Sequence, residues 1–126
     1  MSLDFSLSEI KRTEIFSSNI THNLGEMAEK SGIYDSLWRP YRLHKDFKET
    51  GDYNKEREFE NSVVIKAKNI ISHLEKGLKE LKDRPEYFKK FDAKNGWGTY
   101  EHFVPFVEEI LKACKDNPDA KIEISR

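Results

Sequence analysis

The most constraining feature of the sequence is a run of apolar residues spaced three and four positions apart in the middle of the chain. The run comprises Val64, Ala67, Ile71, Leu74, Leu78 and Leu81. Side chains at this spacing share one face of an α-helix, and that face needs an apolar cover. Asn61 is a suitable N-cap, and Arg84-Pro85 ends the pattern. We therefore predict a helix of about 20 residues, roughly 30 Å long, packed against a core.

Other segments repeat this pattern more briefly. Thr99 precedes a second apolar helical face formed by Phe103, Phe106, Val107, Ile110, Leu111 and Cys114. A first helix is predicted to start at Ser18 or Asn19 and to stop at Gly32. Shorter helical turns are expected over 33–38 and from Pro85 onward.

The two ends of the chain alternate in the manner of strands. Residues 3–7 read Leu-Asp-Phe-Ser-Leu, and residues 13–16 can return as the second arm of a hairpin. After the turn signal at 117–119, Ala120, Ile122 and Ile124 alternate with polar residues. We therefore predict an α+β fold in which three or four amphipathic helices pack on a small, mostly antiparallel sheet formed by the N-terminal hairpin and the C-terminal strand.

The length of 126 residues suits one domain spanning 1–126. The stretch 41–60 interrupts it, because eleven of its twenty residues are charged and it shows neither a helical nor a strand period. We predict a charged, mobile excursion, and a functional loop stays open as the alternative.

Charge and cysteine content narrow the class of protein. The chain has 22 basic and 23 acidic residues, a balance that argues against a dedicated nucleic-acid binder. No apolar run reaches the roughly 20 residues that span a bilayer, and the N-terminus lacks a secretory pattern. The single Cys114 suits a reducing compartment and a place in the core. We expect a cytoplasmic monomer or homodimer with no membrane contact and with a small molecule or another protein as partner.

Catalytic and metal-binding patterns are missing from the sequence. His22, His44, His73 and His102 are scattered, and no phosphate-binding loop or serine-hydrolase elbow is present. We therefore predict no metal and no cofactor. Whether the chain is an enzyme stays open.

Polar residues gather at the expected start of the first helix, where helix N-termini attract anions. Thr21, His22 and Asn23 could hold a carboxylate, a phosphate or an amide. In the alternative reading, Asn19 caps the helix, Thr21 closes on its own backbone and His22 is exposed.

Two tryptophan segments are the remaining candidates for a site. They are Trp38-Arg39-Pro40 and Asn95-Gly96-Trp97-Gly98-Thr99-Tyr100. A tryptophan at a rigid loop can stack on a ligand, and neighbouring glycines allow close approach to the backbone. The alternative is that each tryptophan fills the core.

As an ordered set, these motifs resemble an uncharacterised family of small bacterial and phage-encoded proteins. The motifs are Asn-Ile-Thr-His-Asn-Leu at 19–24, Trp-Arg-Pro at 38–40 and Asn-Gly-Trp-Gly-Thr-Tyr at 95–100. The resemblance covers about 13–40 and 62–126. It departs at 41–60, which looks like an insertion, and at Pro105. The family has no assigned activity, so the resemblance implies relatedness without a reaction.

The leading hypothesis is a small non-catalytic binding module. Its polar-aromatic pocket would take a small anionic or amide-bearing ligand, or a peptide end. The candidate ligand-binding residues are Asn19, Thr21, His22, Asn23, Trp38, Arg39, Asn95, Trp97 and Tyr100. Two alternatives are a protein-interaction or assembly module, and a small enzyme with His22 as general base.

Overall fold

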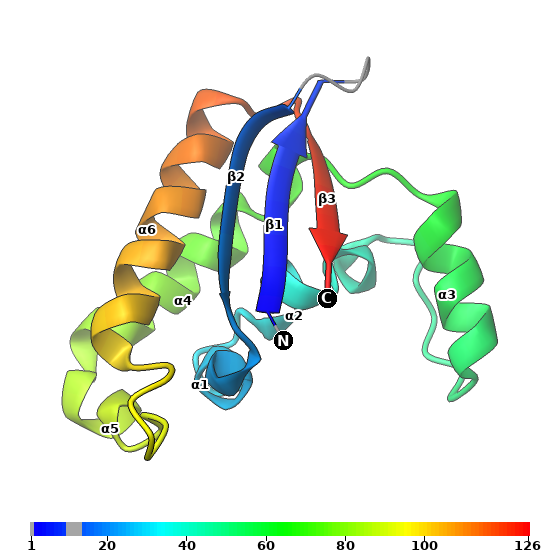
Figure 1. The fold of residues 1–126 in the computed structure, drawn as a ribbon. Helices are drawn as coiled ribbons and strands as arrows, with labels where there is room; N and C mark the ends of the chain where they lie inside the picture. The colour runs from blue at the N-terminus through cyan, green and yellow to red at the C-terminus, as the bar shows by residue number, and fades with distance from the viewer. Residues whose placement is uncertain (1, 10–13) are drawn as a thin grey trace.

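The sheet is built from the two ends of the chain. In the computed structural model, which describes residues 2–9 and 14–126, β1 (Ser2–Ser8) lies between β2 (Glu14–Thr21) and β3 (Lys121–Ser125) (Figure 1). Both neighbours run antiparallel to β1. The predicted hairpin and closing strand are thus confirmed. Thr13, the expected start of the second arm, lies outside the described residues.

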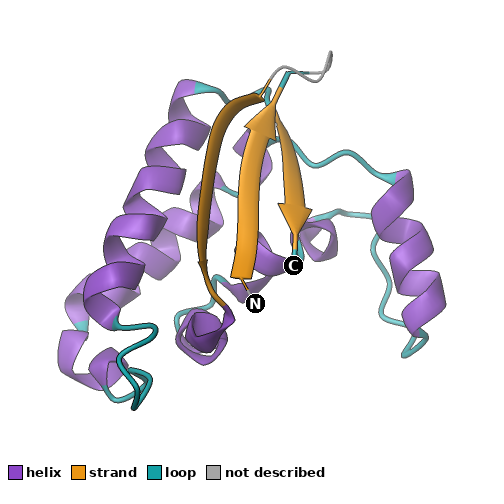
Figure 2. Ribbon diagram, in the orientation of Figure 1, coloured by secondary structure: helices purple, strands orange, loops and turns teal. Residues whose placement is uncertain are grey.

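The helices complete an α+β fold (Figure 2). They are α1 (Gly25–Lys30), α2 (Tyr34–Trp38), α3 (Tyr53–Ser62), α4 (Ile71–Asp83), α5 (Pro85–Lys89) and α6 (Tyr100–Asp116), with 3-10 turns at 22–24, 40–43 and 67–69. Alternation along β1 buries Leu3, Phe5 and Leu7 against this helical layer. Helix α3 stands apart from the other helices, beside β3 (Figure 1).

One apolar cluster joins the sheet to α4 and α6. It includes Leu74 and Leu81 from α4, and Phe103 and Cys114 from α6. Burial raises the pKa of the Cys114 thiol to about 12, as expected for a core cysteine. Gly77 lets α4 approach Ile33 closely, because a Cβ at residue 77 would overlap Ile33 Cγ2.

The predicted start of the first helix is wrong. Residues 18–21 continue β2, and Ile20 pairs with Leu3 in the buried face of the sheet. The pattern 20, 24, 27, 28 therefore spans a strand end, a 3-10 turn and α1. Gly32 does end the segment after α1, with a φ of 82°.

The predicted start of the long helix is also wrong. Asn61 belongs to α3, and α4 begins only at Ile71. Between them the chain is extended: Ile65 O accepts a hydrogen bond from Ile122 N (2.9 Å), and Ala67 N donates to Ala120 O (2.8 Å). Val64, at 56% exposure, faces away from the core that it was expected to enter. Pairing with β3 overrides the helical spacing here.

The stretch 41–60 is more structured than its composition suggests. Its second part forms α3, which begins after Asp52, whose Oδ1 accepts hydrogen bonds from Asn54 N (2.9 Å) and Lys55 N (3.2 Å). The expectation of no helix was wrong because α3 buries none of its residues and so lacks an apolar face. The mobility of this stretch stays a prediction.

Candidate functional site

His22 and Trp38 lie side by side, as the binding hypothesis requires, but they hydrogen-bond to each other and not into an open pocket. Trp38 Nε1 donates to His22 Nδ1 at 2.8 Å, so the proton of a neutral His22 is on Nε2. The Trp38 ring is 2% exposed and stacks on Tyr34 with centroids 5.2 Å apart. Among the described residues, no carboxylate lies within 4.0 Å of His22 to orient it as a general base.

The Trp97 loop also reaches the expected segment. Asn23 Nδ2 donates to Trp97 O at 2.8 Å, and a Cβ added to Gly98 would lie 3.0 Å from Thr21 Cγ2. Thr21 Oγ1 accepts from Asn23 N, so Thr21 closes on nearby backbone, as the alternative reading proposed. These polar groups hold the loop in place, and the Trp97 residue is 72% exposed.

The remaining candidates near this loop have structural partners. Asn95 Oδ1 accepts from Trp97 N (3.0 Å), which stabilises the turn. Tyr100 donates its hydroxyl to Leu81 O (2.9 Å) and its amide to Asp92 Oδ1 (2.7 Å). Asn19 caps no helix, because it lies in β2 opposite Asp4.

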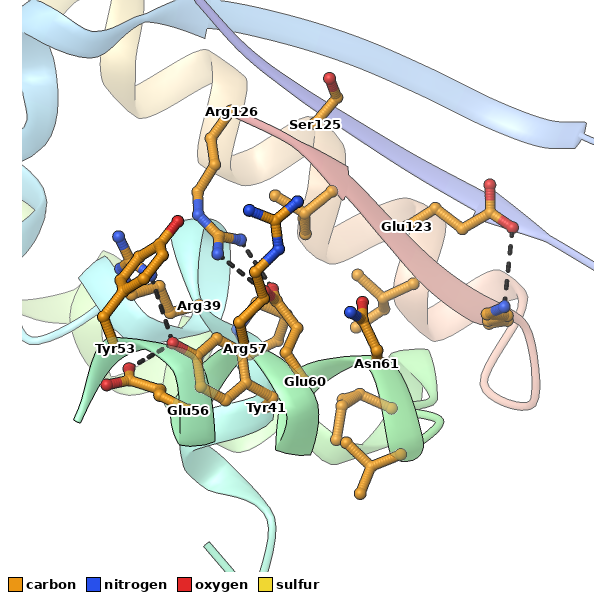
Figure 3. Close-up of a pocket in the computed structure, with 16 residues that line it drawn as sticks. Arg39, Tyr41, Tyr53, Glu56, Arg57, Glu60, Asn61, Glu123, Ser125 and Arg126 are labelled. Carbon is orange, nitrogen blue, oxygen red and sulfur yellow. Dashed lines mark hydrogen bonds and ion pairs between the residues drawn. The ribbon is translucent and has the colours of Figure 1, made fainter. Parts of the chain in front are cut away.

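Of the nine candidates, only Arg39 lines the pocket that lies between α3 and the edge of β3 (Figure 3). The pocket has a volume of about 550 Å³, within the range typical of ligand sites. The side of α3 that borders it carries Tyr53, Arg57 and Asn61, which are four residues apart. Ile124 and Arg126 border it from the opposite side.

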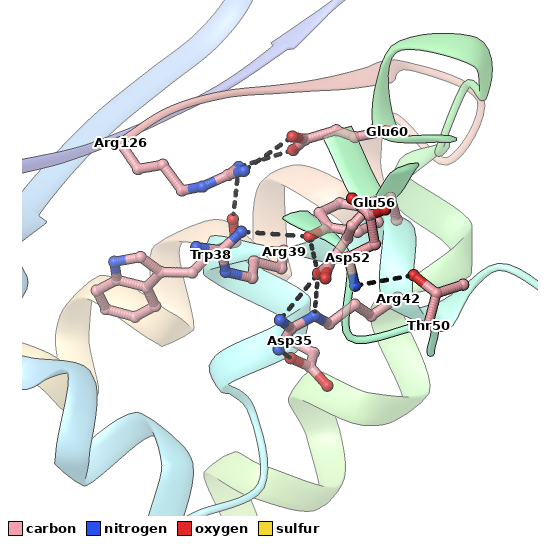
Figure 4. Close-up of polar contacts among 10 residues, drawn as sticks. Asp35, Trp38, Arg39, Arg42, Thr50, Asp52, Glu56, Glu60 and Arg126 are labelled. Carbon is pink, nitrogen blue, oxygen red and sulfur yellow. Dashed lines mark hydrogen bonds and ion pairs between the residues drawn. The ribbon is translucent and has the colours of Figure 1, made fainter. Parts of the chain in front are cut away.

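A polar network holds the base of α3 (Figure 4). Tyr41 Oη donates to Glu56 Oε1, which also accepts from Arg42 Nε at 2.9 Å. Arg42 reaches Asp35 on α2 at 3.4 Å. The Tyr41 hydrogen bond and the Arg42 guanidinium lower the pKa of Glu56, whereas burial and the bond to Glu56 raise the pKa of Tyr41.

A second polar link ties α3 to the end of β3. Arg126 binds Glu60 through two hydrogen bonds of 2.7 and 2.8 Å, and it donates a third to Trp38 O at 3.1 Å. Such two-pronged pairing fixes direction as well as distance. Phe59 adds an aromatic contact on α3, with its ring centroid 5.7 Å from that of Phe47. These contacts therefore hold α3 beside the sheet without direct packing, and the space between α3 and β3 is the pocket.

The acidic side chains of the pocket all have basic partners, whereas two of its arginines lack acidic ones among the described residues. Its three carboxylates, on Glu56, Glu60 and Glu123, each lie within 4.0 Å of a basic side chain. Two of its arginines have no such partner: neither Arg39 nor Arg57 lies within 4.0 Å of a carboxylate of the described residues. Arg39 instead donates to Tyr41 Oη at 3.2 Å. The pocket thus offers two guanidinium groups to an anion.

Sequence reasoning missed Tyr53, Arg57, Glu60 and Arg126. The signal available was Asp52 as an N-cap, followed by polar residues spaced three and four apart at Tyr53, Glu56, Arg57, Glu60 and Asn61. A search for apolar helical faces does not detect α3, because the side of α3 that borders the pocket is charged.

Comparisons with family models, with curated proteins and with solved structures find no match to the chain. Within the described residues, no helix combines the length and apolar character needed to cross a membrane. The same residues contain no group of three or more His, Cys, Asp or Glu side chains placed to hold a metal ion. The assignment of function therefore rests on the pocket.

Proposed function

We propose that the chain is a non-catalytic binding module whose ligand carries a carboxylate and occupies the pocket between α3 and β3. The supporting observation is that Arg39 and Arg57 line this pocket without a carboxylate partner among the described residues. Guanidinium groups match the planar geometry of carboxylates and bind them through paired hydrogen bonds. A small anionic ligand and a peptide that presents a carboxylate both meet this requirement.

The setting of the protein belongs to the same proposal. One buried cysteine suits a cytoplasmic protein. The motifs at 19–24, 38–40 and 95–100 support relatedness to the small bacterial and phage-encoded proteins that they resemble. This relatedness suggests no reaction of its own, and it leaves the pocket as the basis of the functional proposal.

Titration with succinate at constant ionic strength tests this function. We expect saturable changes in the arginine Nε–Hε signals of Arg39 and Arg57 in proton–nitrogen NMR spectra. Arg57→Gln should weaken binding about tenfold, because it removes a charge-assisted hydrogen-bond donor.

Arg84→Gln is the matched control. Arg84 follows α4, pairs with Glu80 at 3.0 Å and does not line the pocket. Its replacement should leave succinate binding unchanged. Equal weakening by both substitutions would indicate only a general effect of net charge, and the proposed site would then be wrong.

A further inference from the structure

The edge of β3 that borders the pocket has unused backbone groups. In the antiparallel ladder with β1, Leu7 pairs with Ile122 and Phe5 pairs with Ile124. Ile122 N donates away from β1, to Ile65 O. Antiparallel neighbours alternate in the direction of their N–H and C=O groups with a period of two. The N–H and C=O of Ile124 therefore also point away from β1, toward the pocket.

The chain covers only the beginning of this edge. Ile65 hydrogen-bonds to Ile122, and Ala67 hydrogen-bonds to Ala120. The residues before Ile65 lead back to α3, which ends at Ser62. No described backbone group bonds to Ile124 on this side. An uncovered strand edge is a template for a further strand, and here it lies inside a pocket (Figure 3).

The opposite wall fits the side chains of such a strand. Figure 3 shows Arg57 and Asn61 directed from α3 toward β3, and Arg39 lies at the same pocket. Because alternate side chains of a strand share one face, two acidic side chains two residues apart can both meet this wall while the backbone pairs with Ile124. The two arginines without carboxylate partners select acidic side chains.

We infer that the ligand is an extended acidic peptide segment that adds to the outer edge of β3 as a fourth strand, with its carboxylates at Arg39 and Arg57. This inference rests on the proposed function and specifies its ligand. The peptide would continue the antiparallel pattern that residues 65–67 begin. Main-chain hydrogen bonds would supply affinity, and the arginines would supply the preference for acidic sequences.

A labelled peptide, acetyl-TEVEVT-amide, is the probe for fluorescence anisotropy. We expect it to bind the full chain, and its lysine counterpart, acetyl-TKVKVT-amide, to bind at least about tenfold more weakly because both charges are reversed. N-methylation of the peptide at the two valines or at the two glutamates removes strand hydrogen-bond donors and keeps the carboxylates. Whichever pair faces β3 should weaken binding about tenfold or more when methylated.

Amide hydrogen exchange provides the direct readout on the protein. Addition of the acidic peptide should slow exchange at Ile124 N–H, because this group gains a hydrogen-bond acceptor. Ile124→Pro removes the same donor without removing a bond to β1, and prolines are tolerated at strand edges. This variant should bind the acidic peptide at least about tenfold more weakly than the unmodified chain. If Ile124→Pro does not fold, the methylated peptides and the exchange measurement still decide the question.

The outcomes separate the two proposals. If both methylated peptides bind as tightly as the parent and Ile124 exchange is unchanged, strand addition is overturned while carboxylate binding stands. If neither succinate nor the acidic peptide binds, both proposals are overturned. Preference for a single-stranded oligonucleotide over the peptide, or protection of Ile124 by self-association alone, would also overturn the inference.

Discussion

The two sides of the molecule are held together by different forces. On one side α4 and α6 bury apolar faces, including Leu74 and Phe103, against the sheet. On the other side α3 buries none of its residues and is held by Glu56, Glu60 and the half-buried Phe59. Apolar burial contributes in proportion to area, whereas exposed polar contacts contribute little each. We therefore distinguish a stable scaffold, which comprises the sheet with α4 and α6, from a weakly held arm, which is helix α3. The candidate pocket lies between the scaffold and the arm.

Matched phenylalanine truncations give the largest expected effect. Phe103→Ala should lower the free energy of unfolding by about 3–5 kcal/mol, because it opens a cavity in the core. Phe59→Ala should lower it by only about 1 kcal/mol, since Phe59 contacts Phe47 and His44 outside the core. Urea denaturation followed by circular dichroism measures both. Equal losses would show that α3 belongs to the cooperative core, which would end the distinction.

The same distinction explains what the sequence could predict. Leu74, Leu78, Leu81 and the α6 stripe were assigned correctly because burial imposes a helical period on apolar residues. Val64 and Ile20 fitted that period by coincidence, and their true places depend on pairing with strands distant in sequence. Non-local pairing leaves no periodic trace in the segment itself.

The candidate site was predicted only in part, for a related reason. The sequence suggested that His22, Trp38 and the Trp97 loop come together, and the contacts of His22 and Asn23 bring them together. The alternative that each tryptophan fills the core is confirmed for Trp38, which is buried, and is wrong for Trp97, which is exposed. Arg39 lines a pocket, but this pocket contains neither His22 nor Trp97, with which Arg39 was predicted to act. Its neighbours on α3 were missed, since charged residues carry no signal of which partner they will meet.

Acidification should loosen the arm before the scaffold. The pKa of Glu56 is held below its ordinary value of 4.5, so the ionised form stabilises the folded arm. This contribution is complete above the pKa of an unfolded glutamate and is lost as the pH falls through the lower folded value. We expect α3 amides to lose hydrogen-exchange protection, corrected for intrinsic rates, as the pH falls below the ordinary glutamate value of 4.5. The amides of α4 and α6 should keep theirs.

Glu56→Gln should reproduce this loosening at neutral pH. The expected local loss is about 1 kcal/mol, because an amide replaces a carboxylate that accepts from Tyr41 and Arg42. Glu108→Gln is the control on the other side: Glu108 pairs with Lys82 at 3.0 Å, and both side chains are about half exposed. This substitution should change α6 protection little. If α3 stays protected in Glu56→Gln, the Arg126–Glu60 pair and the contacts of Phe59 are sufficient to hold α3.

Trp97 provides the smallest expected effect, and the buried Trp38 is its comparison. Trp97→Ala should change the free energy of unfolding by less than about 0.5 kcal/mol, because the residue is 72% exposed and Asn23 binds the backbone carbonyl that alanine retains. Trp38→Phe removes the donor to His22 and should cost about 1–3 kcal/mol. Acrylamide should quench Trp97 in the Trp38→Phe protein far more strongly than Trp38 in the Trp97→Ala protein. A loss above about 1 kcal/mol for Trp97→Ala would place the 92–99 loop with the scaffold, because only a packed ring contributes that much.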